Sequence, residues 1–80
     1  DDKMAEQEQI KKHIQEQLEK VNRRLKILDM IEEKLFRMRE LAQRVIDEEI
    51  TDEEIEEINK QVQDLGEQVR LLDSEVTLLS

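Results

Sequence analysis

Residues 48–55 read Glu48-Glu49-Ile50-Thr51-Asp52-Glu53-Glu54-Ile55, and this segment decides the fold. Thr51 is followed three residues later by Glu54, which is the pattern of a capping box. In that motif the threonine hydroxyl accepts a hydrogen bond from a helix amide, and the glutamate carboxylate accepts a hydrogen bond from the amide of the threonine. Asp52 and Glu53 suit the positive end of a helix dipole. The segment therefore predicts a helix that begins at about residue 52, with Thr51 and Glu54 as its cap.

A regular apolar repeat follows this segment. Two core positions recur through four consecutive heptads, with β-branched residues at the first position and mainly leucine at the second. Such a repeat is typical of a helix that pairs with another helix in a coiled coil. The residues predicted to pair are Ile55, Val62, Val69 and Val76 at the first position and Ile58, Leu65, Leu72 and Leu79 at the second.

A second helical pattern precedes the segment. Apolar residues recur from Ile10 at alternating steps of four and three, and the apolar stripe widens from Leu28 onward. A helix that is apolar on so many rows has to contact more than one neighbour. The helix-pairing residues predicted here are Ile14, Leu18, Val21, Leu25, Leu28, Ile31, Leu35, Met38, Ala42 and Val45, with Ile27, Leu41 and Ile46 in flanking rows.

The two repeats are out of register with each other. Leu18 and Ile55 are 37 residues apart, which is five heptads and two residues, and the break coincides with the capping box. We predict one all-α domain over residues 1–80, an antiparallel two-helix hairpin of the coiled-coil type. Its first helix is expected over about 3–48, its turn at about 48–51 and its second helix over about 52–79. The alternative is one bent helix of about 120 Å, at ~1.5 Å per residue, because the turn contains no glycine or proline.

The composition offers little for a compact core and no grouping typical of catalysis. The chain has no cysteine and one aromatic residue, Phe36, and 80 residues bury too little surface to be comfortably stable without cross-links or partner subunits. His13 has no second histidine or cysteine at metal-ligand spacing. Ser74 and Ser80 have no base to activate them, and there is no glycine-rich phosphate loop. We therefore predict that the protein is not an enzyme, with no catalytic, cofactor-binding or metal-binding residues and no cofactor.

The net charge of −9 is concentrated in the second half of the chain. Residues 1–46 carry 11 basic and 10 acidic groups, whereas residues 47–80 carry 2 and 12. So acidic a half repels nucleic acid and anionic membranes. No apolar run approaches the roughly 20 residues that a membrane-spanning helix needs. We expect a soluble protein with no nucleic-acid or membrane partner, and a solvated acidic turn rather than a calcium site, since the EF-hand pattern is absent.

One stretch resembles a known family. It runs Leu35-Phe36-Arg37-Met38-Arg39-Glu40-Leu41-Ala42-Gln43, followed by Thr51-Asp52-Glu53-Glu54 and a helix with Ile58, Leu65 and Val69. Residues 25–72 resemble the helix-turn-helix in the amino-terminal core region of bacterial flagellin. The resemblance implies a structural protein whose helices bundle and pack against other subunits. It also implies that the helix-pairing region contains Arg37, Met38, Arg39, Leu41 and Ala42.

The wide apolar surface of the first helix predicts partners. A second helix of about 28 residues leaves the amino-terminal part of the first helix, with Ile14 and Leu18, beyond its reach. We therefore expect a homodimer, two hairpins in a four-helix bundle, that acts as a self-association or scaffold module. The sequence leaves open whether the subunits run parallel or antiparallel. The alternative function is an adaptor or chaperone-like module whose exposed apolar row, or Met30, Phe36 and Met38, receives an amphipathic helix of another protein.

Overall fold

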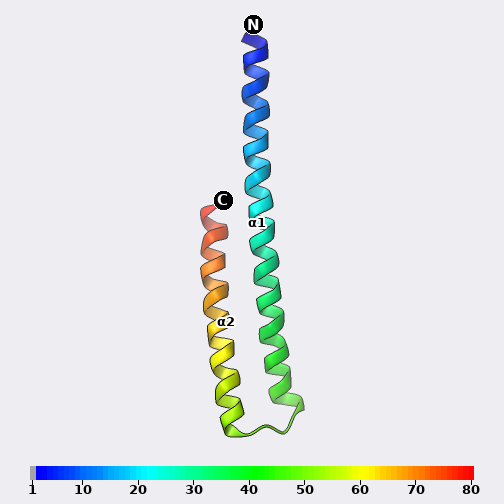
Figure 1. Cartoon of the computed structure of the whole chain (residues 1–80), viewed down its shortest axis with the longest axis vertical. Helices are drawn as coiled ribbons and strands as arrows, with labels where there is room; N and C mark the ends of the chain where they lie inside the picture. Colours follow the sequence, from blue (N-terminus) through cyan, green and yellow to red (C-terminus); the bar gives the residue numbers. More distant parts are fainter. Residues whose placement is uncertain (1) are drawn as a thin grey trace.

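The computed structural model describes residues 2–80, which form two helices joined by a short turn. Helix α1 spans Asp2–Asp47 and α2 spans Asp52–Leu78. The helices lie side by side and run in opposite directions (Figure 1). The predicted hairpin is therefore confirmed, and the alternative of one continuous helix is wrong. Each helix begins and ends within one residue of the bounds expected from the sequence.

The turn is built around the capping box. The hydroxyl of Thr51 accepts a hydrogen bond from the amide of Glu54 at 3.1 Å, and Oε1 of Glu54 accepts one from the amide of Thr51 at 3.5 Å. Thr51 has an extended backbone, with φ −75° and ψ 161°. No non-glycine residue among 2–80 has a positive φ, so this turn requires no glycine. That is why the chain reverses direction here although the segment lacks the usual turn residues.

Arg44 links the two ends of the turn. Its Nε donates to Oε2 of Glu48 at 3.1 Å, and its Nη2 lies 3.6 Å from Oε2 of Glu54. The arginine therefore joins the end of α1 to the carboxylate that caps α2. All three side chains are about half exposed, so each ion pair contributes only about 0.2–1 kcal/mol. The pairs orient the turn more than they stabilise it.

Loss of the cap gives a first testable prediction. Thr51→Ala removes the oxygen that accepts the Glu54 amide, and we expect the free energy of unfolding to fall by roughly 0.5–2 kcal/mol. Urea denaturation followed by circular dichroism measures the change. Thr77→Ala is the matched control, because the Thr77 hydroxyl bonds only the carbonyl of Asp73 inside the last turns of α2. Equal midpoints for the two variants would contradict a stabilising role for the cap.

The molecule is a rod. Its extents are 74 × 18 × 11 Å, and its radius of gyration is 20.9 Å, against about 12 Å for a compact domain of this length. The 46 residues of α1 extend over about 69 Å, and the 27 residues of α2 over about 40 Å. The amino-terminal part of α1 therefore projects beyond the end of α2 (Figure 1). Residues 2–23, all of them exposed, are called the arm below.

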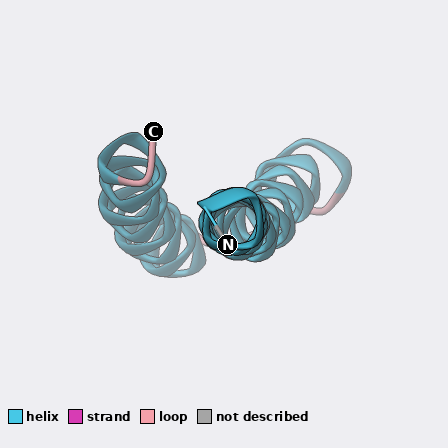
Figure 2. Ribbon diagram, turned by 90° about the horizontal axis from the view of Figure 1, so that it is seen from above, coloured by secondary structure: helices cyan, strands magenta, loops and turns pink. Residues whose placement is uncertain are grey.

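The core between the helices is small. Among residues 2–80 only Leu41, 2% exposed, and Ile58, 5% exposed, are buried. Half-buried residues at helical spacing flank this pair on both helices. They are Arg24, Ile27, Ile31, Lys34 and Met38 on α1, and Gln61, Val62, Leu65, Gly66, Val69, Leu72 and Val76 on α2. Seen along the long axis, α1 and α2 lie side by side with no other element of the described chain covering them (Figure 2).

The row of α1 that faces α2 is not the row that was predicted from the sequence. Leu41 was expected in a flanking row, but it is the most buried residue of the molecule. Leu35 and Ala42, expected in the main row, are exposed. The facing row instead repeats as Ile27, Lys34 and Leu41, beside Ile31 and Met38. Lysine can lie in such a row because its aliphatic stem packs while its ammonium group reaches water.

Gly66 gives a second prediction. It lies within α2 with no positive φ, and an added Cβ would meet only the Cε of Met38, at an ordinary contact distance of 3.7 Å. Gly66→Ala should therefore raise the free energy of unfolding by about 1 kcal/mol, since alanine has the higher helix propensity. The urea midpoint measures this, with Gln63→Ala at an exposed position of the same helix as the control. A lower midpoint for Gly66→Ala would show that the helices cannot accept the methyl group.

Candidate interaction surface

An apolar strip on α1 is left uncovered by the hairpin. Its six members, called the outer seam below, are between 41% and 59% exposed. They follow heptad spacing, so they lie along one side of the helix. The outer seam consists of Ile14, Leu18, Val21, Leu25, Leu28 and Leu35.

The outer seam lies beside the row that faces α2. In an α-helix of 3.6 residues per turn, the two rows together form an apolar arc about 160° wide. Helix α2 covers only one edge of that arc, where Leu41 is buried and Met38 is half-buried. The other edge, from Ile14 to Leu35, stays in water. An exposed apolar strip of this length is the kind of surface against which another chain can pack.

The structure divides the predicted pairing residues into two groups. Those brought together between the helices are Ile31, Met38, Ile58, Val62, Leu65, Val69, Leu72, Val76 and Leu79. Those that are exposed are Ile14, Leu18, Val21, Leu25, Leu28, Leu35, Ala42, Val45 and Ile55. The capping pair, Thr51 and Glu54, bond each other at the turn.

Some residues of the row of α1 that faces α2 were not predicted from the sequence. Arg24 and Lys34 are half-buried there, and Ile50 is half-buried in the turn. A signal for the row did exist, because Ile27, Lys34 and Leu41 recur every seven residues. This repeat was not recognised because the heptads were assigned from apolar residues alone, and Lys34 is not apolar.

Three charged residues occupy core positions of the outer seam. The heptad repeat of the outer seam has a charged residue at three core positions, where apolar residues are usual. They are Lys11 before the seam, Glu32 within it and Arg39 after it. All three are exposed, and none forms an ion pair within residues 2–80. Their charges are therefore available to a partner.

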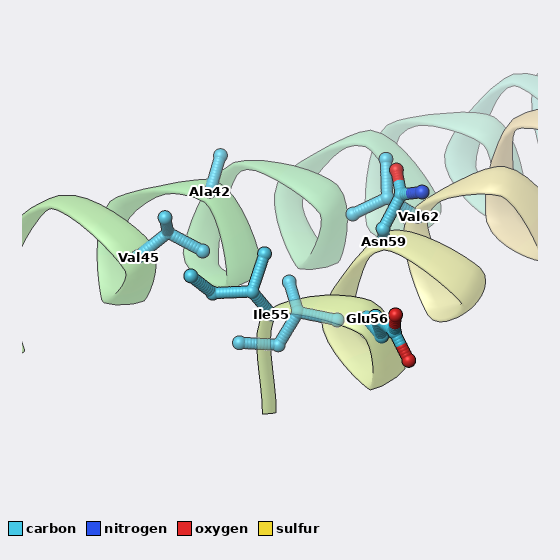
Figure 3. A pocket seen from close by; sticks show the side chains of 7 residues that line it. Ala42, Val45, Ile55, Glu56, Asn59 and Val62 are labelled. Carbon is cyan, nitrogen blue, oxygen red and sulfur yellow. The ribbon is translucent and has the colours of Figure 1, made fainter. Parts of the chain in front are cut away.

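An apolar hollow lies between the helices close to the turn. Its volume is about 380 Å³, and it opens to solvent (Figure 3). Ala42 and Val45 line it from α1, and Ile55, Ile58 and Val62 supply the apolar lining from α2, with Glu56 and Asn59 as polar lining residues. Ala42 stands seven residues after Leu35, so the hollow continues the line of the outer seam.

Residues 2–80 contain no group of three or more His, Cys, Asp or Glu side chains placed to hold a metal ion. His13 is exposed on the arm. The hydroxyl of Ser74 donates to the carbonyl of Arg70 at 3.0 Å, a bond within α2. No helix of the described chain is long and apolar enough to cross a bilayer. No protein-family model, curated protein or solved structure matched the chain.

Proposed function

We propose that the protein is a structural self-association module: a homodimer in which two hairpins contribute four helices to one bundle. The observation that carries the proposal is the exposed outer seam, an apolar strip that α2 does not reach. Burial of a valine, leucine or isoleucine side chain contributes roughly 1.5–3 kcal/mol. Six such side chains on each copy supply the driving force for association, and a twofold arrangement is the commonest for soluble homo-oligomers.

Sedimentation equilibrium over a range of concentrations tests this function. Because the method reports mass independently of shape, the elongated outline of the molecule does not disturb the result. We expect a species of twice the 9.6 kDa chain mass, in equilibrium with the monomer at low concentration. A single species of 9.6 kDa at every concentration would contradict self-association.

A flagellin-like structural role is the biological setting that we propose for this module. The support comes from the segment that resembles flagellin, in which Leu41 is buried and Met38 half-buried where two helices pair. The resemblance gives this segment the same role. If the role is correct, the gene should lie among bacterial flagellar genes and its deletion should impair flagellar assembly. Normal flagella and motility in the deletion strain would contradict it.

An adaptor is the second candidate, favoured by the apolar hollow at Ala42 and Val45. A groove of this kind can receive the apolar face of an amphipathic helix from another protein. An adaptor would be monomeric alone and would recover one other protein in stoichiometric amount from its host. That recovery should be lost in Leu28→Glu, within the outer seam, and kept in the solvent-facing variant Gln9→Glu.

A further inference from the structure

The charged residues of the outer seam discriminate between the two ways in which copies could pair. Along α1 the core positions of this seam are residues 4, 7, 11, 14, 18, 21, 25, 28, 32, 35, 39 and 42. Four of the twelve are polar, namely Gln7, Lys11, Glu32 and Arg39. We infer that the two copies run antiparallel, with the arm of each lying along the outer seam of the other. The inference rests on the proposed self-association and specifies its geometry.

A parallel, in-register pair would be electrostatically unfavourable. In that arrangement each core residue meets its own copy across the interface. Lys11 would face Lys11, Glu32 would face Glu32 and Arg39 would face Arg39. Three like-charge layers in one apolar seam weaken association, because like charges brought together at an interface are strongly disfavoured.

An antiparallel pair brings opposite charges together. We centre it at residue 23, where the arm ends and the part of α1 beside α2 begins. Leu18 then lies opposite the partner's Leu28, and Val21 opposite the partner's Leu25. Lys11 lies in the layer next to the partner's Glu32. By the twofold symmetry this charge pair forms twice, and the centre of the seam is apolar throughout.

The residues at the two ends of the paired outer seams determine the register of the antiparallel dimer. With the centre at residue 23, Gln7 lies opposite the partner's Arg39, and Met4 lies opposite the partner's Ala42. Ala42 lines the apolar hollow, and the flexible thioether side chain of Met4 is suited to filling such an irregular gap. A shift of one heptad layer towards the turn would place Glu32 opposite the partner's Val21 and Lys11 opposite the partner's Ala42, so that these two charges would no longer lie in neighbouring layers.

This arrangement also uses the unequal lengths of the helices. Since α2 runs beside residues 24–47 of its own α1, the partner's arm adds a third helix along that stretch. On each side of the twofold axis, three helices of the dimer therefore lie side by side: α1 and α2 of one copy and the arm of the other. Each arm, which has no neighbour in its own hairpin, gains the outer seam of the other copy.

Spin-label distances test the geometry. The chain has no cysteine, so Asn22→Cys and Glu8→Cys each give one labelled site, at equivalent heptad positions beside the outer seam. In the antiparallel dimer the two labels at position 22 are separated along the axis by only about 3 Å, and those at position 8 by about 45 Å. Short distances at both positions would show a parallel dimer and overturn the inference while leaving self-association intact. Absence of any dipolar coupling at both positions would overturn both.

Charge reversal provides an independent test. Lys11→Glu and Glu32→Lys should each raise the dimer Kd by about tenfold or more, because each turns two attractions into repulsions. The double variant restores the opposite charges and should return Kd to within about threefold of the original. Lys12→Glu is the control, since it makes the same charge change on the solvent side of the arm. Single variants that leave Kd unchanged, or a double variant weaker than both singles, would overturn the antiparallel pairing.

Discussion

Leu41→Ala is expected to lower the free energy of unfolding by about 2–5 kcal/mol, the range for removing a leucine side chain from a packed interior. Leu41 is 2% exposed, and Ile58 is the only other buried residue among residues 2–80. A domain of this size has only a few kcal/mol of stability in total. The variant should therefore separate α2 from α1 over much of the population at room temperature. Urea denaturation followed by circular dichroism measures the loss.

The matched control is Leu71→Ala. Leu71 is also a leucine in the middle of a helix, but it is 63% exposed. Its replacement removes the same atoms without opening a cavity and should change the free energy of unfolding by less than about 1 kcal/mol. If both variants lose the same stability, the pairing of α1 with α2 through Leu41 is not what holds the hairpin together.

Ile14→Glu combined with Leu18→Glu is expected to abolish dimerisation. In a symmetric dimer the double substitution removes four apolar side chains from the interface and adds four carboxylates. At roughly 1.5–3 kcal/mol for each apolar side chain, Kd should rise by at least about a thousandfold. The hairpin itself should persist, because both residues lie in the arm, outside the contact between α1 and α2. Sedimentation equilibrium gives Kd, and the urea transition of the dilute monomer reports the hairpin.

Ala5→Glu combined with Gln9→Glu is the control for charge. It adds the same two negative charges to the arm, but at exposed positions away from the outer seam. Kd should change by less than about tenfold, since exposed charges interact weakly through water. An equal loss of association in both double variants would mean that net charge, and not the outer seam, governs dimerisation.

The hairpin could be predicted from the sequence because two local signals agree. The heptads before and after the turn are out of register, and the capping pattern of Thr51 and Glu54 stands where they break. The absence of glycine and proline argued for a continuous helix. It was misleading, because the turn is made from residues with ordinary negative φ angles, and Arg44 joins its two ends.

The choice of the facing row could not be predicted in the same way. The apolar arc of α1 is wide enough for two helix-pairing rows, and hydrophobicity alone favours the row that contains Leu35 over the row that contains Lys34. The deciding features are spatial: Lys34 is half-buried in the row that faces α2, as the aliphatic stem of a lysine allows, and Met38 of that row lies beside Gly66 of α2. The hollow at Ala42 is likewise a product of how the helices are set against each other, which heptad counting does not give.

The arm has a thermodynamic consequence for the protein. In the single chain the arm has no second helix beside it, and an isolated helix of about 20 residues is of marginal stability in water. We therefore expect the arm of a single chain to fray and re-form until another surface buries its apolar side. If the copies associate as proposed, association includes the entropy cost of ordering the arm, and helix content should rise with protein concentration. In the proposed dimer, dilution would therefore cause two changes together, the separation of the copies and the loosening of the amino-terminal turns.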